Sequence, residues 1–209
     1  MATTTPSTAK GRATRERIVR AAAELVAEHG VAAVSLDDVG ALAPASRSQL
    51  YHYFDDKDAL VRAVVDATSD AVLGAQDELI GQLDSWAGIE RWFGALVALQ
   101  RESQARGGCP IGSLAGQLAE RDPQARAAIA AGLGRWEAHL REGLTRMRGR
   151  GKLDPGSDPT ALATATMASL QGGLLLTQVR RDPEQLRIAL DAAWTVLRGA
   201  RRSRAYTRR

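Results

Sequence analysis

The spacing of apolar residues along the chain predicts a protein built almost entirely of helices. From Thr14, a candidate N-cap, apolar side chains recur at steps of three and four residues as far as Gly30, where a helix could end in a left-handed residue. The alternation of apolar and polar residues that marks a strand is rare. We therefore expect an all-α fold of about nine helices, the first of which begins at Thr14.

Capping residues predict two short helices after the first one. Ser35 with Asp38, and Ser46 with Gln49, have the spacing of capping boxes, in which each side chain bonds the backbone N–H of the other residue. Pro44 ends the first of these helices, so only a tight turn separates it from the second. Three helices with a tight turn between the last two are typical of a helix-turn-helix.

The rest of the chain is predicted to form six more helices. Asp55 and Asp58 are expected to cap a fourth helix that begins at Lys57. Five further helices are expected at residues 86–105, 111–119, 122–148, 160–179 and 183–198. Residues 149–159 are predicted to be loop, because glycines and prolines are frequent there.

Positive charge is concentrated at the two ends of the chain. The N-terminal cluster is made of Lys10, Arg12, Arg15, Arg17 and Arg20. Six arginines lie between positions 198 and 209, which is more than the net charge of +4 of the whole chain, so the remainder is slightly acidic. We interpret the C-terminal cluster as a solvated tail, with phosphate or partner contact as the alternative. The N-terminal cluster precedes the predicted helix-turn-helix and is the better candidate for nucleic-acid contact.

The cysteine content and the start of the chain favour a cytoplasmic protein. Cys109 is the only cysteine, so no disulfide can form within the chain, and a reducing compartment is expected. The polar, Thr-rich start does not resemble a signal peptide, and no stretch reaches the ~20 apolar residues of a membrane span. We interpret Cys109 as a small buried hydrophobe, with a redox sensor as the alternative.

The third helix carries polar residues that suit recognition of DNA in the major groove. Its inward face is expected to hold Leu50, Tyr53 and Phe54, which leaves the other side to Arg47, Ser48, Gln49, Tyr51 and His52. Glutamine can pair with adenine, and arginine can reach guanine or a phosphate. Lys57, at the start of the next helix, would meet a phosphate there. The alternative is an ordinary solvated helix face.

The same segment resembles the signature of tetracycline-repressor-like (TetR) regulators. The resemblance covers residues 14–60, and its most specific parts are APASRSQLYHYF at positions 43–54 and DKDAL at positions 56–60. It implies that Tyr51, His52 and Lys57 contact phosphates and that Arg47, Ser48 and Gln49 face the bases. Arg12 and Arg15 are added to this predicted DNA-binding set.

The chain departs from the family pattern in the turn of the helix-turn-helix. Pro44 stands where the family usually has glycine, and Gly40 stands where a small alanine is common. Because proline cannot readily take the left-handed conformation that glycine permits, we expect a different turn geometry.

Similarity is weaker downstream but points to the C-terminal domain of the LmrA-type subgroup. It rests on GCPIGSLA at positions 108–115 and LQGGLLL at positions 170–176. Members of this subgroup tend to control multidrug or small-molecule resistance genes, and in the wider family this domain encloses a ligand pocket and forms the dimer interface. The residues expected around the pocket are Trp86, Trp92, Phe93, Trp136, Leu140, Met147, Met167, Leu170 and Gln171. For each of them, an ordinary place in the core is the alternative.

The resemblance also implies a dimer formed through the last two helices. The residues expected at this interface are Leu170, Gly172, Gly173, Leu174, Leu190 and Trp194. For the two glycines, tight packing within one subunit is the alternative.

Patterns that would indicate an enzyme are missing from the sequence. The three histidines, His29, His52 and His139, lie far apart and without the spacing of a zinc site. Residues 149–152 do not form a phosphate-binding loop, because Leu153 stands where serine or threonine is required. We therefore expect no catalytic residues, no metal and no cofactor.

Taken together, these patterns predict a TetR-type transcriptional regulator with four regions. They are a flexible basic arm (1–13), a helix-turn-helix domain (14–60), a ligand-binding and dimerisation domain (61–198) and a flexible basic tail (199–209). The predicted function is a repressor that binds a palindromic double-stranded DNA operator as a homodimer, without a membrane partner, and is released by a small hydrophobic ligand. The alternative is a DNA-binding or protein-interaction module on the same scaffold without a ligand response.

Overall fold

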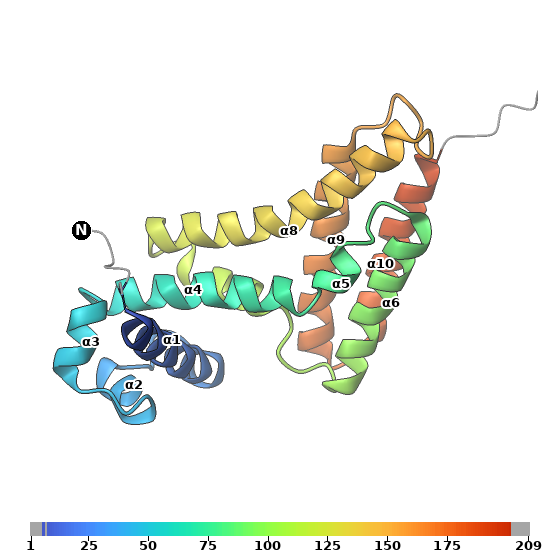
Figure 1. Cartoon of the computed structure of the whole chain (residues 1–209). Helices are drawn as coiled ribbons and strands as arrows, with labels where there is room; N and C mark the ends of the chain where they lie inside the picture. Colours follow the sequence, from blue (N-terminus) through green and yellow to red (C-terminus); the bar gives the residue numbers. More distant parts are fainter. Residues whose placement is uncertain (1–5, 7, 202–209) are drawn as a thin grey trace, which may run out of the picture. The chain divides into compact units, whose positions relative to one another are not determined.

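The computed structural model describes residue 6 and residues 8–201, and this part of the chain is all-helical, with ten helices (Figure 1). These are α1 (Ala9–His29), α2 (Leu36–Leu42), α3 (Arg47–Tyr53), α4 (Lys57–Gly74), α5 (Asp77–Ile80), α6 (Trp86–Glu102), α7 (Pro110–Leu118), α8 (Pro123–Gly149), α9 (Pro159–Arg180) and α10 (Glu184–Gly199). The predicted all-α fold is confirmed. The tail arginines at positions 202, 204, 208 and 209 lie outside the described residues.

The chain packs as two compact units. The N-terminal unit contains the described residues up to Gly74 together with Pro110–Leu133, and the C-terminal unit contains Ala75–Cys109 and the described residues from Gly134 onward. The long helix α8 contributes its first part to one unit and its second part to the other.

The N-terminal unit is built on α1, which contacts α2 and α4, while α7 packs against α4. Its core includes Ile18, Val39, Leu50, Phe54 and Val65, each no more than 1% exposed. Full burial of such a side chain stabilises a fold by about 1.5–3 kcal/mol. These few apolar contacts therefore fix α2 and α3, which are too short to be stable alone.

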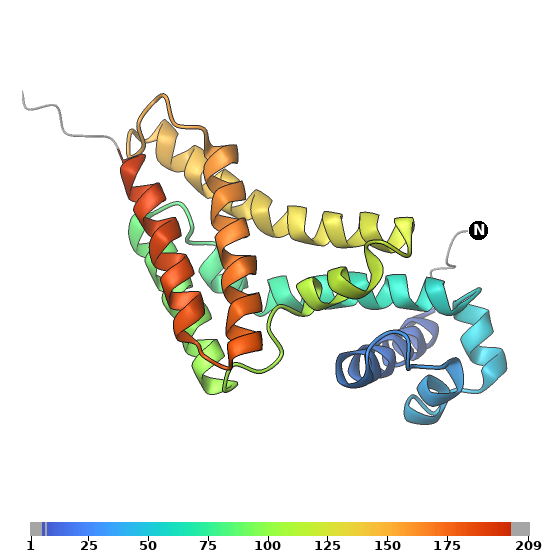
Figure 2. The ribbon, with the colours of Figure 1, turned by 180° about the vertical axis from the view of Figure 1, so that it is seen from behind.

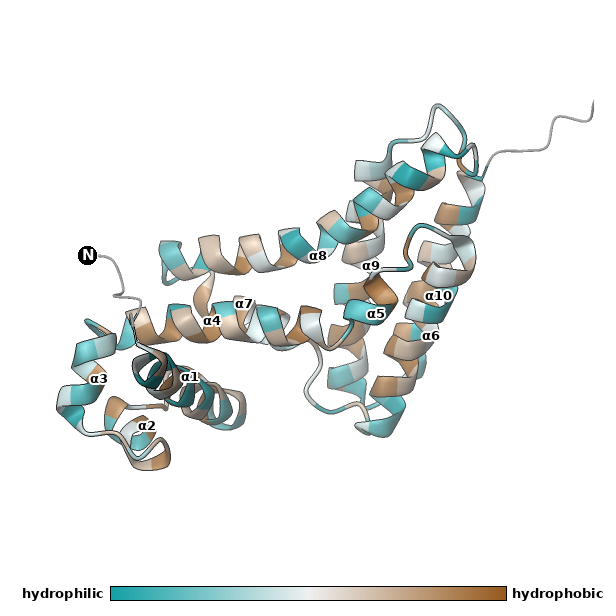
Figure 3. Ribbon diagram, in the orientation of Figure 1, coloured by the Kyte–Doolittle hydropathy of each residue, from teal (hydrophilic) through white to brown (hydrophobic). Residues whose placement is uncertain are grey.

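In the C-terminal unit, α9 and α10 run side by side in both ribbon views, and their contact is the most extensive between any two helices (Figures 1 and 2). Gly173 makes this close approach possible, since a Cβ atom there would lie 2.8 Å from the Cβ of Ala189. Apolar residues also line α6 and α10 along their length (Figure 3). Leu186, Leu190 and Leu197 are buried along α10.

Two of the predicted caps are confirmed and two are corrected. Ser35 and Ser46 are N-caps of complete capping boxes, as expected. The first helix, in contrast, begins at Ala9 with Thr8 as its N-cap, so residues 9–13, expected in a flexible arm, are helical. At the start of α4, Asp56 rather than Asp55 accepts a hydrogen bond from the Ala59 N–H, at 2.6 Å.

The remaining boundaries follow the predictions closely, with two differences. The helix α5 was not predicted, because four residues are too few for an apolar period to show. Helix α6 ends at Glu102, before the expected residue 105, because Gln104 and Ala105 both adopt positive φ angles.

Among the described residues, no helix has both the length and the apolar character needed to cross a membrane. The same part of the chain also holds no cluster of three or more His, Cys, Asp or Glu residues that could bind a metal.

Candidate nucleic-acid interface and effector site

Helix α3 exposes the polar residues that the sequence assigned to DNA contact. Leu50 is 1% exposed and Tyr53 is half-buried, which fixes the inner face of the helix. The side chains on the other side are exposed, and they are Arg47, Ser48, Gln49, Tyr51 and His52. The helix therefore offers hydrogen-bond donors, acceptors and an aromatic ring to solvent along a single surface.

Gln49 is held by its capping box. Its side-chain oxygen accepts a hydrogen bond from the Ser46 N–H at 2.9 Å, and its own N–H donates to the Ser46 hydroxyl at 3.2 Å. A bidentate pair with adenine needs both the oxygen and the amide nitrogen of glutamine. The cap thus competes with base recognition for the oxygen, whereas the amide nitrogen takes no part in the capping box.

Arg47 opens α3 beside an acidic residue of α2. Its Nε lies 3.7 Å from Oδ1 of Asp37, and both side chains are about 70% exposed. An ion pair this exposed contributes little to stability, about 0–1 kcal/mol. Its effect is to orient the guanidinium at the N-terminal end of the helix.

The arginines of α1 have different roles. Arg15 is half-buried, with its guanidinium 5.2 Å from the centre of the Phe54 ring, and Arg17 donates from Nε to the Ala43 carbonyl at 2.9 Å. Both therefore tie α1 to the helix-turn-helix. Arg12 is exposed, and its Nη1 donates to the Pro6 carbonyl at 3.4 Å.

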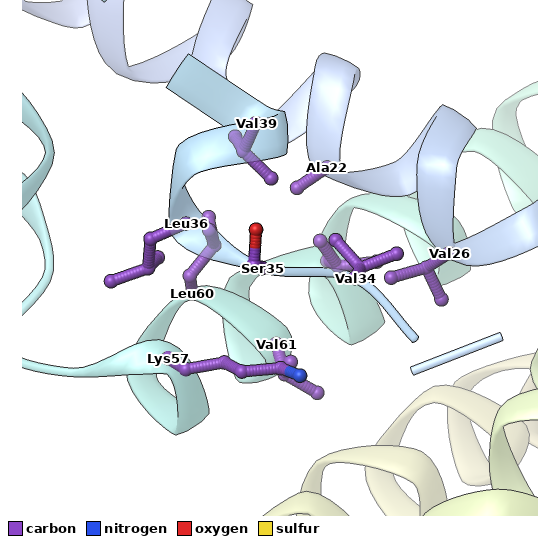
Figure 4. Close-up of a pocket in the computed structure, with 10 residues that line it drawn as sticks. Ala22, Val26, Val34, Ser35, Leu36, Val39, Lys57, Leu60 and Val61 are labelled. Atoms are coloured by element: carbon purple, nitrogen blue, oxygen red, sulfur yellow. The ribbon is translucent and has the colours of Figure 1, made fainter. Parts of the chain in front are cut away.

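Lys57 is the first residue of α4 and is half-buried. Its side chain borders a small cavity whose other walls come from α1, α2 and α4 and from Val34 and Ser35 just before α2 (Figure 4). All of these residues except Ser35 are apolar. The cavity volume is about 10 Å³, which is room for roughly one water molecule. This cavity is too small for an effector.

The turn of the helix-turn-helix corrects the expectation for Pro44. Its φ angle is +21°, far from the −65° that the pyrrolidine ring favours, so the proline does occupy the region of positive φ. The turn is closed by a hydrogen bond from the Ala45 N–H to the Gly40 carbonyl at 2.9 Å. A Cβ atom at position 40 would lie 2.8 Å from the Ala45 carbonyl oxygen, which explains why glycine stands there.

The predicted pocket residues lie in the interior of the C-terminal unit. Most of them are buried, and they are Trp92, Phe93, Trp136, Leu140, Met147, Met167 and Leu170, while Trp86 and Gln171 are half-buried. The aromatic rings form a continuous line in the order Trp86, Trp194, Phe93, Trp92 and Trp136. Neighbouring ring centres are 5.4–6.4 Å apart. The fold thus brings together four of the predicted pocket residues and Trp194, which was expected at the dimer interface.

The predicted dimer-interface residues are mostly not available to a second chain. Leu170, Leu174 and Leu190 are at most 4% exposed, and Gly173 packs against α10 of the same chain. Trp194 is half-buried between Trp86 and Phe93. Of the predicted set, only Gly172 is exposed.

The apolar surface of these two helices lies on their other face. Five large apolar side chains there are 42–71% exposed, and they are Leu175, Leu176, Val179, Ile188 and Val196. Their spacing could have revealed this surface in the sequence. Leu175 and Leu176 lie four and three residues before Val179 on α9, Ile188 lies eight residues before Val196 on α10, and residues at these distances share a helix face. The signal was hidden because α9 is apolar on nearly all sides.

Two family models match segments of this chain. Residues 18–64 match the family model described as bacterial regulatory proteins, tetR family. Residues 87–193 match the model described as tetracyclin repressor-like, C-terminal domain. Together the two matches span the helix-turn-helix and most of the C-terminal unit.

Curated relatives align along most of the chain. An uncharacterized HTH-type transcriptional regulator of Mycobacterium tuberculosis is 30% identical over 175 residues, which is 80% of this chain and 86% of the relative. The transcriptional regulator AcuR of Cereibacter sphaeroides is 26% identical over 173 residues, which is 82% of this chain and 79% of the relative.

Solved structures show the same fold at low sequence identity. The regulatory protein TetR from Rhodobacter sphaeroides has a TM-score of 0.73 at 22% identity and covers 87% of this chain and 97% of its own. A TetR-family regulator from Cytophaga hutchinsonii has a TM-score of 0.78 at 18% identity, covering 95% and 100%.

Proposed function

Because the chain belongs to the TetR family of transcriptional regulators, which are DNA-binding proteins and not enzymes, we propose that it is a ligand-released repressor. It binds a palindromic operator as a homodimer and leaves the operator when a small hydrophobic ligand enters the C-terminal unit. The observation that carries the proposal is the exposed polar face of α3, anchored by Leu50 inside a matching tetR helix-turn-helix.

The DNA contacts divide between bases and phosphates. Arg47 and Ser48, at the N-terminal end of α3, face the bases, together with the amide nitrogen of Gln49. Tyr51, His52 and the ammonium of Lys57 contact phosphates, and Arg12 at the start of α1 adds a further charge. Arg15 supports this surface from below rather than touching DNA, since its guanidinium lies over Phe54.

The homodimer forms through α9 and α10. The exposed apolar residues on these helices, Val179 and Ile188 among them, supply the surface that a second copy would cover. A two-fold axis between the copies would present two α3 helices to half-sites about one helical turn of DNA, ~34 Å, or a little more apart.

The effector enters the C-terminal unit beside the aromatic line. Clusters of aromatic rings with a few polar groups are typical linings of small-molecule sites. The protein acts in the cytoplasm, where its operator lies. Within the family it belongs to the LmrA-type subgroup and controls a resistance gene.

A second candidate function is a DNA-binding module that has lost the ligand response. It is favoured by the dense packing of the predicted pocket residues, since Trp92, Leu140 and Leu170 are completely buried. A compound that raises the melting temperature without changing operator affinity would favour this candidate.

The test begins with selection of bound duplexes from a random pool, which should yield an inverted repeat. On that duplex, Arg47→Ala should relax the preference at one base pair per half-site at a cost of about 1–3 kcal/mol. Arg121→Ala, an exposed arginine between α7 and α8, is the matched control and should bind like the wild type. An asymmetric single site, or equal effects of the two variants, would contradict the proposal.

A further inference from the structure

Three polar atoms in the interior of the C-terminal unit have no hydrogen-bond partner among the described residues. They are the indole nitrogen of Trp136, the amide nitrogen of Gln171 and the amide oxygen of Gln100. Trp136 is 2% exposed and Gln100 is 4% exposed, so water outside the protein does not reach these groups. Leaving a buried polar group unpaired costs about 1–3 kcal/mol, and a native chain tolerates it mainly where the group has another use.

The contacts around these atoms place them at two levels along the lengths of α6 and α9, inside the C-terminal unit. Trp136 lies at the first level, since its neighbour Glu137 accepts a hydrogen bond from Thr164 of α9 and its ring meets that of Trp92 on α6. Gln171 lies seven residues beyond Thr164 along α9, and Gln100 lies eight residues beyond Trp92 along α6.

Helices α6 and α9 run in the same direction, so both glutamines lie at the second level. The loop after α6 meets the end of α9, because Arg181 donates to the Ala105 carbonyl at 3.2 Å and Gln178 packs against Gly108. Gln171 and Gln178 share a face of α9, being two turns apart. Two helical turns, ~10 Å, therefore separate the indole N–H from the level of the two glutamines.

The charge of this interior is also informative. None of the buried residues that the structure describes in the C-terminal unit is Asp, Glu, Lys or Arg; the buried polar ones there are Gln100, Thr166 and Thr177. A charged molecule enclosed here would lose its hydration without gaining a counter-charge, which is strongly unfavourable.

We propose that the effector of this protein is an uncharged, flat, mainly apolar molecule about 10 Å long, with a hydrogen-bond acceptor at one end and an amide-like donor and acceptor at the other. The Trp136 N–H, which can only donate, binds the acceptor end. Gln171 and Gln100 bind the other end, where a donor and an acceptor are both needed. The inference rests on the proposed ligand-released function and names the class of ligand.

Three probes of nearly equal shape test this class by calorimetry on the full chain. The first is 6-methoxynaphthalene-2-carboxamide, which has an ether acceptor at one end and an amide at the other. The second, 6-methoxy-2-naphthoate, replaces the amide by a negative charge, and the third, 6-ethylnaphthalene-2-carboxamide, replaces the ether by an apolar group. The carboxamide with the ether should bind at least about tenfold more tightly than the naphthoate, because the interior offers no counter-charge.

Trp136→Phe removes the indole N–H and keeps an aromatic ring. It should weaken binding of the methoxy carboxamide about threefold to tenfold and leave binding of the ethyl analogue within about twofold. Gln171→Leu should weaken binding of both carboxamides. Gln124→Leu, at an exposed glutamine in the N-terminal part of α8, is the matched control for the glutamine variant and should change the binding of neither carboxamide.

The outcomes separate the ligand class from the regulatory function. Failure of both carboxamides to bind, equal affinity for the naphthoate, or an equal effect of Trp136→Phe on both carboxamides would overturn the inference; the last result would mean that the indole has only a structural role. Operator affinity is measured on the same samples. A carboxamide that binds as expected but leaves operator affinity unchanged supports the ligand class and contradicts the repressor-release function.

Discussion

Pro44 and Gly40 together determine the turn between α2 and α3. Proline at a φ of +21° is strained, whereas the glycine four residues earlier is required by the close approach of the Ala45 carbonyl. Glycine at position 44 should therefore relieve strain, because it adopts a positive φ freely. A side chain at position 40 should introduce a clash, because the Ala45 carbonyl fills the space that it would need.

Pro44→Gly is expected to raise the free energy of unfolding by about 1 kcal/mol. Backbone strain costs about 1–3 kcal/mol, and the greater freedom of glycine in the unfolded chain offsets part of the gain. Gly40→Ala is the companion variant and should lower the same quantity. Urea unfolding curves for both proteins measure the effects, and a destabilised Pro44→Gly variant would show that the turn is unstrained.

The capping box of α2 should make stability depend on acid pH. The hydrogen bond from the Ser35 hydroxyl, followed by that from its backbone N–H, lowers the pKa of Asp38 below its ordinary value. A carboxyl with a lowered native pKa stabilises the fold above the ordinary pKa of aspartate, ~4, and this contribution disappears as the pH falls through the native pKa.

Asp38→Asn is the variant that tests this dependence. Its stability should lie below that of the wild type at neutral pH, and the difference should shrink as the pH falls below ~4. Urea unfolding at a series of pH values gives the comparison. A difference between the two proteins that stays constant with pH would rule out the carboxylate as the source.

At the scale of whole elements, local signals made most of the fold predictable. The boxes of Ser35 and Ser46 are confirmed because a side chain and a backbone N–H three residues apart decide the start of a helix. The predicted start of α1, at Thr14, was wrong because Thr8 and Thr14 are equally good caps in isolation. The choice between them depends on residues 9–13 continuing the helix, which their weak apolar pattern does not reveal.

The candidate sites were less predictable than the helices because they depend on packing between helices distant in sequence. Exposure of Tyr51 and His52 followed from the period of α3 alone. In contrast, Leu170 and Leu190 were expected at the surface between copies and are buried, since α9 and α10 cover one another within the chain. The sequence shows that a helix has two apolar sides, but not which of them its own chain covers.

Gln117 of α7 makes a polar contact with the segment that follows α1. The side-chain oxygen of Gln117 accepts a hydrogen bond from the Val31 N–H at 2.8 Å, just after the C-cap Gly30. Gln117→Ala should lower the free energy of unfolding by about 1 kcal/mol and speed hydrogen exchange at the Val31 amide. Gln124→Ala, on the exposed side of α8, is the control. Unchanged exchange at Val31 would show that this contact does not persist in solution.

For the whole molecule, the proposed function depends on assembly. A palindromic operator requires two copies of the chain, because a single α3 helix reads only one half-site. The exposed apolar side chains of α9 and α10 are the feature of the described chain that most directly favours such an assembly.

Val179→Asp is therefore expected to convert the dimer into a monomer. Val179 is 71% exposed, so a monomer tolerates the aspartate, whereas a dimer that buries position 179 of both copies must desolvate two unpaired charges. Light scattering should give twice the 22.3 kDa chain mass for the wild type and a single chain mass for the variant. Leu99→Asp, an exposed apolar position on α6, is the matched control and should stay dimeric.

Operator affinity should fall with Val179→Asp while circular dichroism stays unchanged, because each copy still folds but the two half-sites are no longer bound together. A dimeric Val179→Asp protein would place the interface elsewhere on the molecule.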